Sequence, residues 1–185
     1  MADIKLNRIF GQSCKRIKGL YLEAFPADER APFWLLKRRA KQGKADFYEL
    51  ADGKVKVGMA YVVTYSDMAY LFYFAVDRSL LGKHYGTRAL KAIMEHYKGK
   101  RLFLALENWN EKCDNREQRL KRHDFYLKCG LHDLPYKLKE AKVTYSIMGM
   151  GGKVEPDEYK RLIGNHLGFP LKYFIDMRII GGKRR

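Results

Sequence analysis

The stretch from Tyr70 to Tyr97 limits the fold of this chain more than any other segment. It opens with an unbroken apolar and aromatic run, Leu71–Val76, which is too short for a helix and typical of a strand buried on both faces. A loop with two glycines follows at residues 81–86. The residues after it repeat with the period of a helix, and one face of that helix is apolar: Tyr85, Ala89, Leu90, Ile93, Met94 and Tyr97. The stretch therefore predicts a buried strand, a glycine loop and an amphipathic helix in succession.

This order of elements can bind an anion. The first N–H groups of a helix have no acceptor within the helix, and the helix dipole favours negative charge beside them. Glycine lets the main chain approach a phosphate closely because no β-carbon intervenes. On pattern alone, a phosphate site and an ordinary strand-to-helix turn both remain open.

Composition sets broad limits on the kind of protein. The chain has 185 residues, of which 46% are hydrophobic and 14% aromatic, and this indicates one folded domain rather than disorder. No apolar segment is long enough to span a bilayer, and the N-terminal residues MADIKLNR do not resemble a signal peptide. Cys14, Cys113 and Cys129 are odd in number and lack metal-ligand spacing. We expect a reduced, cytoplasmic protein without disulfides, metal or membrane contact.

The formal net charge of +16 needs an explanation. One reading is a surface that binds nucleic acid or another polyanion. The other is a solvated basic surface that also attracts an anionic cofactor. No nucleic-acid-binding motif accompanies the charge, so we expect the second reading and do not expect nucleic acid as a partner.

The remaining periodicity predicts strands and helices throughout the chain. We expect residues 1–150 to form one domain, with a helix and an apolar tail at 151–185 packed on it. In the second helix we expect Lys37, Arg38 and Arg39 to be solvated. The predicted strands are 4–10, 47–50, 54–65, 71–76, 102–106, 132–138 and 142–148, and the predicted helices are 12–25, 32–43, 85–97, 114–128 and 156–163.

Two segments resemble the GNAT superfamily of acetyl-CoA-dependent N-acetyltransferases. That family's loop is written Gln/Arg-x-x-Gly-x-Gly/Ala, and residues 81–86 read Leu-Gly-Lys-His-Tyr-Gly. Gly86 matches the last position, whereas Leu81 replaces the usual arginine or glutamine and His84 the middle glycine. Residues 122–131, RHDFYLKCGL, resemble the more specific pattern R-x-x-F-Y-x-x-x-G-F. The resemblance covers roughly residues 4–150.

The resemblance implies an α/β fold with a central, mostly antiparallel mixed sheet flanked by helices. It also implies direct transfer of an acetyl group from acetyl-CoA to an amine of a small molecule, peptide or protein. The acceptor would lie by the first two helices and the turn at residues 25–33, with the closing hairpin of strands 132–138 and 142–148 opposite. A non-catalytic coenzyme A-binding module of the same fold is the alternative, followed by a basic nucleic-acid-binding domain. A homodimer is left open.

The resemblance further assigns roles to particular residues. Tyr126 would be the general acid that protonates the leaving thiolate, and otherwise a buried tyrosine. Glu107, at the end of a buried strand, would be the general base, and otherwise a solvated strand-end glutamate or the partner of a nearby lysine in a salt bridge. Asn108 and Asn115 lie where some relatives hold the cofactor arm. The expected cofactor-binding residues are Asn115, the backbone of Phe74, Ala75 and Val76, and the loop residues Leu81, Gly82, Lys83, His84, Tyr85, Gly86 and Thr87.

Overall fold

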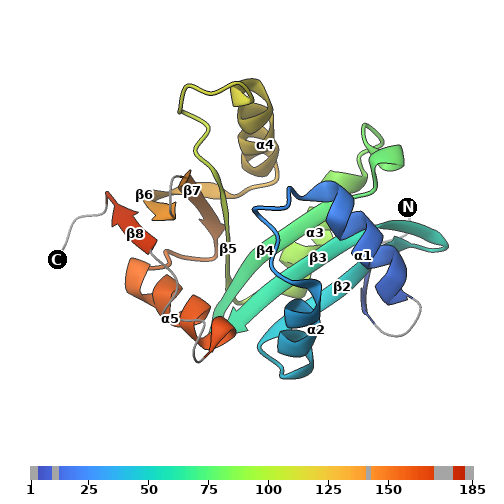
Figure 1. Cartoon of the computed structure of the whole chain (residues 1–185). Coiled ribbons are helices and arrows are strands. Elements are labelled where there is room, and N and C mark those ends of the chain that lie inside the picture. Colours follow the sequence, from blue (N-terminus) through green and yellow to red (C-terminus); the bar gives the residue numbers. More distant parts are fainter. Residues whose placement is uncertain (1–3, 10–12, 141–142, 169–176, 182–185) are drawn as a thin grey trace. The chain divides into compact units, whose positions relative to one another are not determined.

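The computed structural model describes residues 4–9, 13–140, 143–168 and 177–181, with only the backbone at 177 and 179. The chain forms two compact units, and strand β4 (Met68–Val76) contributes to both. Unit 1 comprises Met1–Thr64 and Leu71–Lys98, and unit 2 comprises Tyr65–Tyr70 and Gly99–Arg185. Figure 1 shows the elements of both units.

Unit 1 contains β1 (Lys5–Arg8), β2 (Ala45–Asp52), β3 (Val55–Tyr65) and the second part of β4, which are neighbours in this order. The β1–β2 and β2–β3 pairs are antiparallel. The helices of unit 1 are α1 (Ser13–Ala24), α2 (Phe33–Lys41) and α3 (Tyr85–His96).

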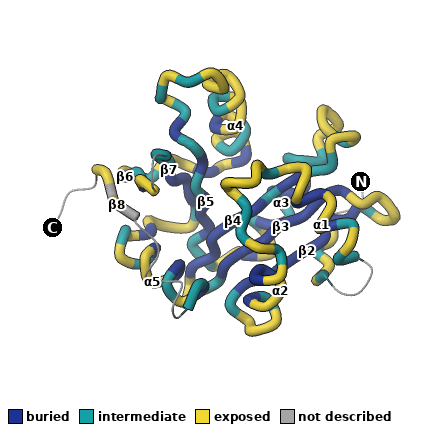
Figure 2. Tube along the Cα trace, viewed as in Figure 1, coloured by how far each residue is buried: buried dark blue, intermediate teal, exposed yellow. Residues whose placement is uncertain are grey.

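Helices cover both faces of the strands in unit 1. Phe47 of β2 packs on Phe33 of α2, with ring centroids 5.6 Å apart. The hydroxyl of the next residue, Tyr48, forms a hydrogen bond of 3.2 Å with Nε2 of His96 in α3. Successive side chains of a strand point to opposite faces, so α2 and α3 lie on opposite sides of β2. This double coverage explains why Val57–Val63 of β3 are all buried, as Figure 2 shows.

The second helix departs from its sequence prediction at one position. Lys37 and Arg38 are exposed as expected, but Arg39 is only 8% exposed. Residues three or four apart share a helix face, and Arg39 therefore lies on the side of Leu35 and Leu36, both buried. Its guanidinium donates to Gln42 Oε1 at 2.8 Å.

Unit 2 begins with residues Met68–Tyr70 of β4, which pair in parallel with Arg101–Phe103 of β5 (Arg101–Glu107). The order then continues with β7 (Val143–Met150), β6 (His132–Glu140) and β8 (Met177–Ile180), all antiparallel to their neighbours. The helices are α4 (Arg116–Lys128) and α5 (Pro156–Leu167). The mixed, mostly antiparallel sheet with flanking helices confirms the expected fold class.

The segment after residue 150 differs in part from expectation. The predicted helix forms as α5, and its Tyr159 ring packs on Tyr70 and Phe103. Strand β8 was not predicted, whereas the rest of the apolar tail, at 169–176 and 182–185, lies outside the described residues. The division of the chain at residue 150 stays a prediction. Within the described residues, no helix is both long and apolar enough to cross a membrane.

Arg101 fastens α5 to the start of β4 in unit 2. Its Nε donates to Asp67 Oδ2 and its Nη1 to Glu158 Oε2, each at 2.7 Å. Nη1 also donates to the Lys153 carbonyl oxygen at 2.8 Å. Hydrogen bonds from Arg101 hold the pKa values of Asp67 and Glu158 below their ordinary values of 3.8 and 4.5. One guanidinium thus joins a turn, a strand and a helix.

We expect Arg101→Met to lower the thermal midpoint at pH 7 by a few degrees, because both carboxylates lose their cation. A carboxyl group with a depressed folded pKa stabilises the protein above its unfolded pKa, and this stabilisation is lost as the pH falls through the folded value. The difference between the two proteins should therefore shrink as the pH drops below 4.5 and 3.8, the ordinary values of the two acids. Circular dichroism melts over a pH series measure this.

Lys121→Met is the matched control for this prediction. It breaks the exposed pair with Glu117, and such surface pairs contribute little. A midpoint for Arg101→Met that equals the control at pH 7 would contradict the anchoring role.

Candidate functional site

The loop from Asp77 to His84 connects β4 to α3 in unit 1. A short 3-10 helix, Arg78–Leu80, begins behind Asp77. Asp77 Oδ1 accepts hydrogen bonds from the Ser79 hydroxyl at 2.7 Å and the Ser79 N–H at 3.0 Å. These bonds hold the pKa of Asp77 below its ordinary value. Asp77 therefore stabilises the conformation of the loop through hydrogen bonds to a residue of the loop itself.

His84 caps the start of α3 in a conformation typical of glycine. Its φ is 59°, in the left-handed region that few non-glycine residues adopt. Its carbonyl accepts the N–H of Arg88 at 3.1 Å. The N–H groups of Tyr85, Gly86 and Thr87 precede this first bond and have no acceptor within the helix. The backbone at the position of the family's middle glycine thus has a glycine-like shape although the residue is histidine.

Cations lie around this helix start. Lys83 Nζ donates to the Ser79 carbonyl at 3.2 Å, and Arg78, whose side chain is 79% exposed, forms a 3.8 Å ion pair with Glu23. Arg88 pairs with Asp52 at 2.7 Å and lies over the Tyr85 ring, 5.3 Å from its centroid. Free amides together with nearby positive charge suit a phosphate group.

The backbone of Phe74, Ala75 and Val76 is held by close approach of β3. A β-carbon on Gly58 would lie 2.1 Å from the Ala75 carbonyl oxygen, so only glycine permits this spacing. The N–H of Asp77 donates to the Val57 carbonyl at 2.9 Å. The strand that leads to the loop is therefore fixed in unit 1 on its β3 side.

The turn between α1 and α2 is fastened to β4 by Tyr73. Its hydroxyl donates to the Glu29 carbonyl at 2.8 Å and accepts from the Ala31 N–H at 2.9 Å. Tyr21 of α1 donates to the Ala31 carbonyl at 2.9 Å, and burial raises the pKa of its hydroxyl. The Tyr73 ring also packs on Phe25, with centroids 4.8 Å apart. The residue that holds the turn, Tyr73, thus directly precedes Phe74 in β4.

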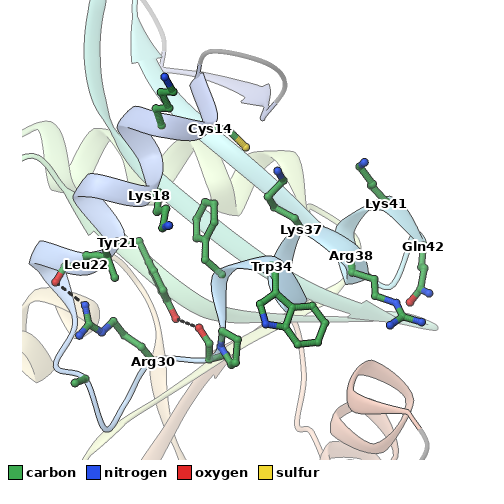
Figure 3. Close-up of a pocket in the computed structure, with 15 residues that line it drawn as sticks. Cys14, Lys18, Tyr21, Leu22, Arg30, Trp34, Lys37, Arg38, Lys41 and Gln42 are labelled. Carbon is green, nitrogen blue, oxygen red and sulfur yellow. Dashed lines mark hydrogen bonds between the residues drawn. The ribbon is translucent and has the colours of Figure 1, made fainter.

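A groove of about 980 Å³ runs along α1, this turn and α2 (Figure 3). Its location agrees with the part of the acceptor region that the sequence assigned to the first two helices and the turn. Its lining combines apolar residues with lysines and arginines: Cys14, Lys15, Lys18, Tyr21, Leu22, Ala27, Arg30, Ala31, Pro32, Phe33, Trp34, Lys37, Arg38, Lys41 and Gln42.

Glu107 ends β5 in unit 2 and forms ion pairs with two arginines of α4. Arg119 Nη2 donates to Oε1 in a very short hydrogen bond, and Arg122 Nη2 donates to Oε2 at 3.0 Å. The Glu107 side chain is 16% exposed. Arg122 is the first residue of the R-x-x-F-Y segment, so the structure joins two candidate features that the sequence treated separately. The sequence offered no signal for the pairing with Arg119.

Asn108 follows Glu107 and is the centre of a polar network. Its Oδ1 accepts from Lys137 Nζ at 3.1 Å and from Ser146 Oγ at 3.2 Å, and its Nδ2 donates to Glu111 Oε1 at 3.2 Å. The bond from Asn108 holds the pKa of Glu111 below its ordinary value. Asn108 is 6% exposed, and its amide is occupied by contacts within unit 2. Asn115, by contrast, is an exposed residue at the start of α4.

Tyr126 lies on α4 near its end. Its side chain is half-buried beside Phe125, and burial raises the pKa of its hydroxyl to about 12. Within the described residues the hydroxyl has no hydrogen-bond partner. Helix α4 ends at a glycine in the left-handed region: Gly130, after the C-cap residue Cys129, has a φ of 99°, and Leu131 N–H donates to the Tyr126 carbonyl at 3.1 Å. Cys129 is buried, as expected of a structural thiol.

The sequence model of the Acetyltransferase (GNAT) family matches residues 14–131. This match includes the loop at 81–86 and all of the second segment, 122–131. A comparison with curated proteins found no match.

Several solved structures share the fold. A putative GNAT acetyltransferase from Bacteroides thetaiotaomicron is 21% identical, with a TM-score of 0.72 over 91% of this chain and 98% of that one. The ribosomal-protein-S18-alanine N-acetyltransferase of Escherichia coli is 14% identical, with a TM-score of 0.60 and coverages of 82% and 98%. A Bacillus subtilis acetyltransferase in complex with CoA is 17% identical, with a TM-score of 0.55 and coverages of 81% and 98%. This chain therefore belongs to the GNAT acetyltransferase family and is an acyltransferase.

Proposed function

We propose that this chain transfers the acetyl group of acetyl-CoA directly to an amine of a small molecule, peptide or protein. The observation that carries the proposal is the start of α3, where free N–H groups follow a histidine in a glycine-like conformation. The Bacillus subtilis structure contains CoA, and the Escherichia coli enzyme is named for an alanine of a ribosomal protein. Both support a coenzyme A donor and an amine acceptor.

The residues present fit such a donor. The N–H groups of Tyr85, Gly86 and Thr87 would bind the pyrophosphate, with the loop backbone from Leu81 to His84 beside them and Lys83 adding positive charge. The backbone of Phe74–Val76 would hold the pantetheine amides, and Asn115 is the further candidate for the cofactor arm.

In the proposed reaction, acetyl-CoA supplies a thioester carbonyl as the electrophile. Glu107 accepts a proton from the acceptor ammonium, through water, so that the neutral amine can form a bond to the carbonyl carbon. As the carbon–sulfur bond breaks, Tyr126 gives its hydroxyl proton to the sulfur, and the nitrogen of the new amide loses its extra proton, through water, to the tyrosinate. A tyrosine with a pKa of about 12 retains that proton at neutral pH. Glu107 must perform its role while Arg119 and Arg122 hold its oxygens.

Calorimetric titration with acetyl-CoA and with CoA tests the cofactor assignment. We expect stoichiometric binding in the micromolar range, about −8 kcal/mol. A second test concerns the conformation of His84. His84→Gly should retain acetyl-CoA binding and raise the free energy of unfolding by about 0.5–1 kcal/mol. The reason is that the left-handed conformation costs histidine more free energy than the extra backbone entropy of glycine in the unfolded chain costs the variant. His84→Ala keeps the β-carbon and serves as control. Weaker binding in both variants would instead assign a phosphate contact to the imidazole, and no binding by the native protein would refute the proposal.

Tyr126→Phe should reduce turnover about 100-fold, because it removes the proton donor while keeping the ring. The dissociation constant for CoA should stay unchanged in calorimetry. Tyr159→Phe, which removes another hydroxyl in unit 2, is the control and should retain turnover. Equal losses of turnover and CoA affinity in Tyr126→Phe would make Tyr126 a packing residue.

Glu107→Gln should also reduce turnover about 100-fold, because an amide cannot accept the proton of the acceptor ammonium. Arg122→Gln removes one ion pair but keeps the carboxylate, so its turnover should be retained. Steady-state kinetics and thermal melts measure both variants. If Arg122→Gln loses as much activity and stability as Glu107→Gln, the glutamate is an anchor for α4 and not the base.

A further inference from the structure

We propose that the groove between α1 and α2 binds an acidic segment of a peptide, which makes an amine of an acidic peptide or protein the acceptor. This inference rests on the proposed acetyl transfer and names its substrate class. It comes from the charge and exposure of the residues that line the groove and from the hydrogen bonds of the turn at its base.

Two stripes of side chains form the groove walls. On α2, Trp34, Lys37, Arg38 and Lys41 recur at the spacing that places side chains on one helix face, and all four are exposed. On α1, Lys15, Lys18 and Leu22 recur in the same way and are also exposed. Figure 3 shows Lys18 of α1 with Lys37 and Trp34 of α2 on this groove.

The charge of the groove is not neutralised. Its lining includes six basic residues and neither aspartate nor glutamate: Lys15, Lys18, Arg30, Lys37, Arg38 and Lys41. Within the described residues, the four lysines and Arg38 have no ion-pair partner. Elsewhere in unit 1, Arg16 and Lys56 share Glu49, and Arg88 pairs with Asp52. Like charges gathered without counterions favour an anionic occupant.

The apolar part of the lining favours a peptide over a nucleic acid. Trp34 is 62% exposed and Leu22 48% exposed, although large apolar side chains are usually covered. Ala27, Ala31 and Pro32 of the turn add aliphatic surface. Single-stranded nucleic acids bind by stacking successive bases on aromatic rings, whereas here one exposed tryptophan stands among aliphatic groups. Acidic side chains alternating with leucine or similar residues match both the cations and this surface.

The turn at the base of the groove is hydrogen-bonded to β4 and adjoins the proposed donor strand. The Tyr73 hydroxyl holds both Glu29 and Ala31, and Tyr73 precedes Phe74 in β4. An acceptor bound along α1 and α2 is therefore held by the same unit as the segment proposed for the pantetheine arm. A preorganised site loses less entropy on binding than a flexible one.

Binding can be measured without any acetyl donor. Trp34 and Trp109 are the two tryptophans, so in a Trp109→Phe background the fluorescence reports on the groove. The probe is a short peptide with a free N-terminal amine in which glutamate and leucine alternate. The comparison ligands are the same peptide with lysine in place of glutamate, and a single-stranded oligouridylate. We expect the acidic peptide to shift the emission of Trp34 and to bind more weakly as salt increases.

Lys18→Glu/Lys37→Glu should weaken binding of the acidic peptide about tenfold or more, because it places like charge opposite the ligand. The matched control is Lys5→Glu/Lys91→Glu, which makes the same charge change at exposed positions of unit 1 outside the groove and should retain binding. Equal effects of the two double variants, equal affinity for the lysine peptide, or tighter binding of the oligouridylate would each overturn the proposal.

Failure here is distinguishable from failure of the proposed function. If the protein acetylates other amines with acetyl-CoA but does not bind the acidic peptide, only the substrate class is refuted. If the peptide binds in the groove while acetyl-CoA does not bind at all, the groove assignment as a peptide site is supported and acetyl transfer is refuted.

Discussion

One hydroxyl group, that of Tyr73, holds the turn between α1 and α2 against strand β4 in unit 1. It accepts from one backbone amide of the α1–α2 turn and donates to one backbone carbonyl, so a proline-containing turn is fixed to the central strand by two bonds. A turn without regular structure has few hydrogen bonds of its own, and buried polar groups must find partners. The two helices that form the groove walls thus share a turn that is hydrogen-bonded to β4.

Unit 2 uses polar contacts for a similar purpose. The exit of β5 carries Glu107 and Asn108 in succession, and these two side chains together bind residues of α4, β6 and β7. A satisfied polar network specifies a single arrangement more strictly than apolar packing does, because each displaced member leaves a costly unpaired group. The position of the candidate acid on α4 therefore depends on the strand end that carries the candidate base.

The sequence predicted features whose cause is local. The strand at Leu71–Val76 and the amphipathic face of α3 each follow from a few neighbouring residues, and the structure contains both. The expected burial of that strand on both faces is wrong, because Phe72, Phe74 and Val76 are only partly buried. The family loop and the position of Glu107 at a strand end were predictable for the same reason. Features that depend on contacts between residues far apart in the sequence could not be predicted. Arg101 meets Glu158 across 57 positions, and Tyr73 meets Glu29 across 44, so no window of sequence contains both partners. Strand β8 was missed for the same reason, because a segment of four residues forms a strand only where a neighbouring strand, here β6, offers an edge to pair with.

The unneutralised groove also has a consequence for selectivity. A cluster of lysines without counterions attracts every anion in its surroundings, including nucleotides and nucleic acids, and charge alone cannot tell them apart. A segment that reaches the apolar surface around Trp34 and Leu22 gains contacts that a small ion cannot make. The apolar residues would then discriminate between peptides and other anions, while the cations set the rate at which any anion associates. In a cell, competition among these anions would determine the effective affinity for the peptide.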